Sequence, residues 1–176
     1  MGEREDLVET LDKHRGLLRR TVRDLTDEQA ARRTTASELC LGGLIKHVAA
    51  VEARWARFIT GGAEAMRGGD GGSGGDGGSG GGSGGDGWAA QFRMADGETL
   101  AGLLAGYEAV ARGTDELVRS LPDLDHGHPL PPAPWFEPGA SWSARRVLLH
   151  LIAETAQHAG HADIIREALD GAKSMG

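Results

Sequence analysis

The sequence predicts an all-α protein, a four-helix bundle in which long loops connect the helices. Apolar residues recur at steps of three and four along four separate stretches, which is the period of an amphipathic helix. No stretch alternates apolar and polar residues over a useful strand length. A Gly-rich tract and a Pro-rich segment separate the stretches. Amphipathic helices with long connections bury their apolar sides against one another, which favours a bundle.

The first predicted helix lies near the N-terminus. Its apolar residues share one side: Leu7, Leu11, Leu18 and Val22. Charged residues fill its other directions. A short helical turn is predicted next, because Thr26 and Gln29 have the spacing of a capping box. This turn is expected to lead the chain back antiparallel.

The second predicted helix covers residues 41–59 and ends at Gly61 and Gly62. Its apolar residues recur at three- and four-residue steps: Leu44, Val48, Val51, Trp55, Phe58 and Ile59. Trp55 is a core residue by this spacing. His47 lies on the same stripe, where a hydrophobic residue is expected. It is therefore the first candidate functional residue.

Residues 68–87 consist only of Gly, Ser and Asp, so they have no side chains that could pack in a core. We predict a flexible linker or loop between the second and third helices. The sequence leaves open whether this tract is a natural loop or an engineered connection. Residues 1–176 are expected to form a single domain, because the remaining chain is long enough to bury an apolar interior.

The third predicted helix begins near Asp96 or Thr99 and ends before Pro122. An irregular crossover loop is expected over residues 122–142, which contain all the prolines of the chain. The last helix is expected to begin at a Ser141 or Ser143 cap and to stop at Gly171. Its buried stripe is predicted to contain Val147, Leu151, Glu154, His158, Ala162 or His161, Ile165 and Leu169.

Composition excludes several classes of function. The formal net charge of −7 and the pI near 5.5 argue against nucleic acid as a partner. Cys40 is the single cysteine, which fits a reducing compartment. The charged N-terminus lacks the apolar core of a signal peptide, and no apolar run is long enough to span a bilayer. We therefore expect a cytoplasmic protein without a membrane partner.

Glu154 and His158 are four residues apart, so both side chains rise on one face of the last helix. A carboxylate in an apolar stripe is costly unless a cation or several donors compensate it. If the second and last helices are neighbours, His47 converges with this pair. Two imidazoles and one carboxylate suit zinc or another first-row divalent ion and leave a coordination position open.

Other interpretations stay open from the residues alone. A single interior histidine is more often a hydrogen-bonded core residue than a ligand, and Glu154 with His158 could form an ion bridge across one turn. His150 and His161 on the same helix offer alternative pairs of ligands. A helical interaction module without a metal is a further alternative.

Two segments resemble the DinB-like metalloproteins: residues 43–52, GLIKHVAAVE, and residues 150–163, HLIAETAQHAGHAD. The closer likeness is to the single-domain branch of unknown function related to the N-terminal domain of mycothiol-dependent maleylpyruvate isomerase. The resemblance covers the chain outside the Gly-rich tract. It implies a four-helix bundle with His47, Glu154 and His158 as metal ligands. Many members have His at both positions of the last helix, whereas the mycothiol-dependent branch has Glu at the first, as here.

The resemblance also implies a function. A divalent metal ion, zinc first with nickel, iron or manganese as alternatives, would activate a thiol such as mycothiol for transfer to an electrophilic substrate. We expect a thiol S-transferase or a related detoxification or biosynthetic enzyme. The alternative is a non-catalytic metal-binding or small-ligand-binding protein of the stress-response type. Related bundles often dimerise, which extends the expectation of a homodimer to this chain.

Three further residue assignments follow. The isomerase has a second domain that contributes to its active site, whereas this chain ends at Gly176, so isomerase activity is not expected. Cys40 lacks an evident base and is interpreted as a small buried residue rather than the nucleophile. Trp135 and Phe136 of the crossover loop could line a substrate pocket.

Overall fold

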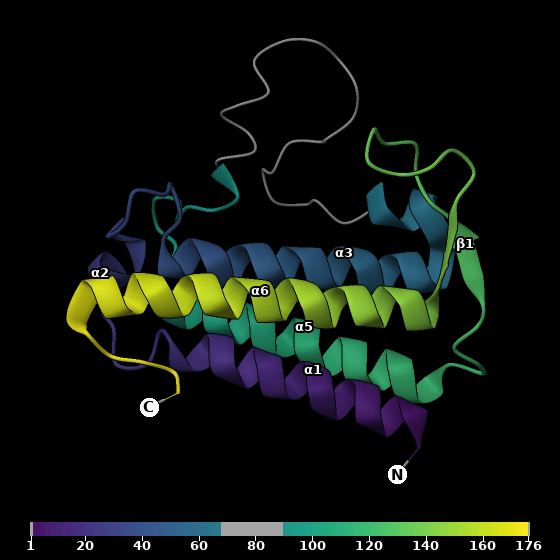
Figure 1. The fold of residues 1–176 in the computed structure, drawn as a ribbon, viewed down its shortest axis with the longest axis horizontal. Coiled ribbons are helices and arrows are strands. Elements are labelled where there is room, and N and C mark those ends of the chain that lie inside the picture. Colours follow the sequence, from purple (N-terminus) through teal and green to yellow (C-terminus); the bar gives the residue numbers. More distant parts are fainter. Residues whose placement is uncertain (1, 68–89, 176) are drawn as a thin grey trace.

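The computed structural model describes residues 2–67 and 90–175. Four long helices run side by side: α1 (Glu3–Arg20), α3 (Leu41–Arg67), α5 (Leu100–Ser120) and α6 (Ala144–Asp170). In Figure 1 α6 lies between α3 and α1, and it packs on both of them; α5 packs on α3 and α1. This arrangement confirms the predicted all-α four-helix bundle. The Gly-rich tract at residues 68–87, predicted to be a flexible linker, lies outside the described residues.

The turn after α1 is built by the predicted capping box. The short helix α2 (Asp27–Ala31) begins after Thr26, whose side chain accepts a hydrogen bond from the Gln29 N–H at 3.2 Å. The side chain of Gln29 in turn accepts one from the Thr26 N–H at 2.9 Å. Two backbone donors that the start of a helix leaves unpaired are thereby satisfied, and the chain turns back towards α3.

The ends of the long helices follow the caps in the sequence, with one difference. The side chain of Thr99 accepts from the Gly102 N–H at the start of α5, so Thr99 rather than Asp96 is the cap. Gly62 has φ 67° and ψ −158°, but the chain resumes a helical path to Arg67. The predicted end at Gly61 and Gly62 is therefore a kink, because a single left-handed glycine breaks the hydrogen-bond ladder without preventing another turn.

The last helix begins and ends at predicted residues. Ser143, and not Ser141, caps α6 by accepting a hydrogen bond from the Arg146 N–H at 3.2 Å. Gly171 ends the helix in a left-handed conformation with φ 79°, which a residue without Cβ adopts at little cost. These two caps set where α6 begins and ends, and Glu154 and His158 lie between them.

The crossover loop contains a small sheet that the sequence did not reveal. β1 (Gly127–Pro129) pairs antiparallel with β2 (Ser141–Ser143), and Gly127 lies opposite Ser143. A Cβ at Gly127 would lie 2.7 Å from the carbonyl oxygen of Trp142, so the close pairing requires glycine there. The expectation of a wholly irregular loop was wrong, because three-residue strands are too short to show a period of two.

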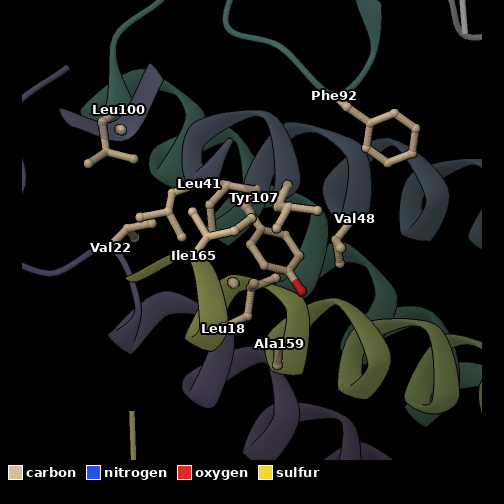
Figure 2. Close-up of a cluster of buried hydrophobic side chains, with 13 residues drawn as sticks. Leu18, Val22, Leu41, Val48, Phe92, Leu100, Tyr107, Ala159 and Ile165 are labelled. Carbon is tan, nitrogen blue, oxygen red and sulfur yellow. The ribbon is translucent and has the colours of Figure 1, made fainter. Parts of the chain in front are cut away.

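The apolar core has two clusters. Tyr107 is fully buried in the first, and Figure 2 shows its ring among side chains from α1, α3 and α6. Trp55 and Phe58 belong to the second cluster, with Trp55 buried as its spacing predicted. Among the described residues, none of the helices is apolar enough over its length to cross a membrane.

A buried charge cluster links three of the long helices. Arg15 of α1 is fully buried and binds the carboxylate of Glu52 on α3 through both Nε and Nη2. Its Nη1 also donates to Asp115 of α5 at 2.9 Å and to Asp12 at 2.5 Å. Burial opposes the charge of Arg15, but these carboxylates more than offset it and raise its pKa above the ordinary value. Arg15 therefore stays charged and holds the three helices in one register.

The segment that follows the Gly-rich tract lies against the start of α3. A Cβ at Gly43 would lie 1.8 Å from the carbonyl oxygen of Phe92, and one at Gly42 would lie 2.3 Å from the sulfur of Met94. The sulfur of Cys40 is 3.5 Å from the same Phe92 oxygen, to which its S–H donates. Glycines at positions 42 and 43 thus allow a close approach that places residues 91 and 92 beside α3.

Replacing Gly43 with alanine is expected to destabilise the protein by about 1–3 kcal/mol, because the new methyl group overlaps a backbone carbonyl that must move. The matched control is Gly113→Ala on α5, where nothing lies within 4 Å of the added Cβ. This control should stabilise the helix by up to about 1 kcal/mol. Urea unfolding of both variants measures the difference, and equal effects would contradict the close packing at Gly43.

Candidate metal centre

The structure brings together the three side chains that the sequence singled out. α3 supplies His47, and α6 supplies Glu154 and His158 one turn apart. The Oε1 atom of Glu154 lies 3.5 Å from Nε2 of His47 and 3.3 Å from Nε2 of His158. One donor atom from each residue lies within 4.8 Å of the other two. Two imidazoles and one carboxylate therefore converge from neighbouring helices.

The spacing of these donor atoms suits a small divalent cation. Ligand atoms at about 2.0–2.1 Å from zinc in a tetrahedral arrangement lie about 3.3–3.4 Å from one another. The two distances from the Glu154 oxygen have this magnitude. Three protein donors would fill three positions of such a tetrahedron and leave the fourth open, which is the pattern of catalytic rather than structural zinc sites.

The centre lies at the edge of the core. The side chains of His47 and His158 are 5% and 11% exposed, whereas that of Glu154 is 23% exposed. Glu154, predicted to lie in the buried stripe, is therefore only partly buried. Contacts with His158 and His47 lower the pKa of Glu154 well below its ordinary value, and partial burial opposes this only in part. The carboxylate is thus ionised at neutral pH and partly exposed to solvent.

Two neighbouring side chains contact the outer nitrogens of the histidines. Nδ1 of His47 lies 3.2 Å from Oε1 of Gln91, and the ring of Phe92 packs on the His47 ring at a centroid distance of 4.2 Å. Nδ1 of His158 lies 3.4 Å from Nδ1 of His161. The sequence offered His161 as an alternative ligand, but it gave no signal for Gln91, which lies outside every periodic stretch.

His150 is not part of the convergent group. It lies one turn before Glu154 on α6 and packs edge-on against Trp55 and Trp142 at centroid distances of 5.1 and 5.2 Å. Burial lowers the pKa of His150, so the ring is neutral at neutral pH. Trp55 and Trp142 stack on each other at 4.8 Å. The structure therefore places His150 in an aromatic cluster beside the centre.

The aromatic and histidine residues of the crossover loop occupy other places. Nε2 of His128 lies 3.3 Å from the carbonyl oxygen of Ile59, and His126 is exposed beside it. Trp135 is 77% exposed and contacts Phe136, which in turn packs on Trp142. Nothing in the described part of the chain connects Trp135 directly with the three convergent side chains.

Two surface hollows lie away from the centre. One of about 290 Å³ surrounds Glu3, Asp125 and Arg145 near the start of α1, and one of about 300 Å³ lies along α1 beside Arg119. Ion pairs of Arg145 with Glu3 and Asp125 cross the first hollow. Neither hollow includes His47, Glu154 or His158.

Fold and centre together define a class of protein: a four-helix bundle with one histidine on the second long helix and a Glu-x-x-x-His pair on the last, as the resemblance to DinB-like proteins implies. The chain belongs to the mycothiol-S-transferase family, whose model matches residues 6–171. This membership agrees with the DinB-like resemblance. Comparisons with curated proteins and with solved structures gave no significant match.

Proposed function

We propose that this protein is a metal-dependent mycothiol S-transferase with His47, Glu154 and His158 as the metal ligands. The observation that carries the proposal is the convergence of two imidazole nitrogens and one carboxylate oxygen within 4.8 Å at a partly exposed position. Membership of the mycothiol-S-transferase family supports the choice of thiol. Zinc is the first choice of metal, because this donor set with one open position suits it.

The charge of the donor set favours an anionic substrate. Glu154 is the only charged donor, since neutral imidazoles are the form that binds metals. A divalent cation there would lower the pKa of a coordinating thiol and so supply the nucleophile at neutral pH. His47 and His158 would bind the cation from two neighbouring helices, and Glu154 would leave the occupied centre with one net positive charge. That charge favours the thiolate over the thiol.

The transfer itself is a substitution at carbon. The thiolate sulfur forms a bond to the electrophilic carbon, and the leaving group departs with the electron pair of the bond that breaks. The thiol proton passes to solvent, so no oxidant or reductant is required. Cys40 is not the nucleophile in this scheme, because it is buried and its sulfur is engaged with Phe92 and with the Gly43 N–H at 3.4 Å.

Protein purified without a His tag is expected to contain about one equivalent of metal and to accelerate the reaction of mycothiol with a bimane or chloroaromatic electrophile. The measurements are elemental analysis and product formation over time, with chelator-treated protein as the control. Reloading the chelated protein with zinc should restore turnover. Equal rates with and without metal across the electrophile panel would contradict the proposed enzyme.

A non-catalytic metal-binding protein is the second candidate. The observation that favours it is that neither hollow includes a candidate ligand. Such a protein would retain the metal and bind mycothiol without turnover. The same experiment separates the two functions, because metal content with no product formation is the result expected of the binding protein alone. A homodimer and a cytoplasmic location remain predictions.

A further inference from the structure

Each candidate ligand histidine has both ring nitrogens engaged, and the two sides of each ring differ. The Nε2 atoms of His47 and His158 both face the same oxygen of Glu154, at 3.5 and 3.3 Å. The Nδ1 atoms face outward, towards Gln91 and His161. A histidine binds a metal through a nitrogen that carries no proton, so the partner of the other nitrogen decides which atom is available.

Gln91 offers a hydrogen-bond acceptor to the outer nitrogen of His47. Its Oε1 lies 3.2 Å from Nδ1, and an amide oxygen only accepts hydrogen bonds. When Nδ1–H of His47 donates to this oxygen, Nε2 keeps the lone pair that a cation needs. Nε2 also faces Oε1 of Glu154 at 3.5 Å, the second donor atom of the candidate centre.

His161 is the corresponding partner of the outer nitrogen of His158. The two Nδ1 atoms are 3.4 Å apart, so one of them donates and the other accepts. If Nε2 of His158 holds the cation, its proton is on Nδ1, and Nδ1 of His161 is the acceptor. His161 then carries its own proton on Nε2. The three-residue spacing on α6 places the two rings side by side at a centroid distance of 5.4 Å.

We propose that Gln91 and His161 are the positioning residues of the metal centre, each accepting the Nδ1–H of one ligand histidine and so directing its Nε2 lone pair at the cation. This inference rests on the proposed metal site. Neither acceptor is a carboxylate, so neither adds negative charge to the centre. The net positive charge that favours an anionic thiolate is thereby kept, whereas a carboxylate acceptor would reduce it.

The position of Gln91 is itself built into the fold. The neighbouring Phe92 is held against α3 by the close approach at Gly43, by the Cys40 sulfhydryl and by ring packing on His47. Further along the segment, Lys46 of α3 pairs with Glu98 at 2.8 Å. The segment that follows Gln91 is therefore fixed on α3 at Phe92 and at Glu98, which keeps the amide oxygen close to Nδ1 of His47.

Gln91→Ala and His161→Ala are each expected to weaken zinc binding by roughly 10- to 100-fold, the usual cost of losing such a partner. Titration calorimetry with zinc, competed by a chelator of known affinity, measures the effect. Gln91→Glu and His161→Gln should restore most of the affinity, because each still offers an acceptor oxygen. Gln157→Ala and His126→Ala are matched controls at exposed positions and should bind zinc as the parent protein does.

Nitrogen-15 NMR of the zinc-loaded protein supplies a readout that loss of stability alone would not move. The parent should show zinc on Nε2 and a slowly exchanging proton on Nδ1 for both ligand histidines. Each alanine variant should lose the slow exchange at its own histidine only. Unchanged zinc affinity in both alanine variants, or zinc on Nδ1, would overturn the assignment while the proposed function stands. A parent protein that binds no zinc would instead sink the proposed function.

Discussion

Replacing His158 with alanine is expected to remove the bound metal during purification and to lower thiol transfer by more than roughly 100-fold, since loss of an outer partner alone costs up to that amount. His158 supplies one of three donor atoms, and the remaining pair, His47 and Glu154, would hold the cation from two helices with two positions open. Elemental analysis and the rate of mycothiol conjugation measure the result. His47→Ala should behave in the same way.

Glu154→His and His126→Ala are the informative controls for this prediction. Glu154→His keeps three donors and should retain metal, but the occupied centre then has two net positive charges instead of one. His126→Ala removes an exposed histidine of the crossover loop and should change neither metal content nor rate. If His158→Ala retains one equivalent of metal with parental affinity, the three-ligand assignment is wrong.

Replacing Arg15 with methionine is expected to lower the free energy of unfolding by about 3–5 kcal/mol, because it leaves the fully buried Glu52 carboxylate without its cation. Asp115 and Asp12 lose the same partner, but their side chains are 14% and 52% exposed, and water can solvate them. Urea unfolding followed by circular dichroism measures the change. The effect is expected without any loss of the metal ligands themselves.

A double variant tests whether the loss in the free energy of unfolding comes from the unpaired Glu52 carboxylate. Arg15→Met combined with Glu52→Leu should recover most of the lost stability, because apolar side chains of similar volume can replace a buried ion pair. Arg67→Met is the matched surface control: Arg67 pairs with Glu64 at 2.7 Å, but both are exposed, and the expected change is under about 1 kcal/mol. Equal effects of Arg15→Met and Arg67→Met would contradict the burial argument.

The helices and their boundaries were largely predictable because the signals are local. Apolar steps of three and four predicted the four long helices, and Thr26, Thr99 and Ser143 cap the helices that follow them. The candidate ligands were identified for the same reason: a histidine in an apolar stripe and a carboxylate one turn from another histidine stand out in the sequence alone. The resemblance to a known family then favoured Glu154 over His150 and His161 as partners of His158.

Other features depended on contacts between distant parts of the chain. Arg15 and Glu52 look like ordinary surface charges, and only the packing of α1, α3 and α5 shows that they neutralise each other in the interior. The exposure of Glu154, the paired strands of the crossover loop and the contact of Gln91 with His47 likewise went unpredicted. Each of these features depends on the distance between two segments of the chain, and no periodic pattern in the sequence encodes that distance.

The sequence by itself therefore determined the elements of this protein and the types of donor atoms, because helix period, caps and residue chemistry act within a few positions. Only the tertiary structure decided that His47 of α3 meets Glu154 and His158 of α6 at the edge of the core. It alone also brought Gln91 and His161 to the outer nitrogens of the two histidines. The physical reason is that a hydrogen-bond acceptor at one ring nitrogen of a histidine keeps the proton there and leaves the lone pair on the other nitrogen. Helix and loop packing determines which acceptor lies beside the ring.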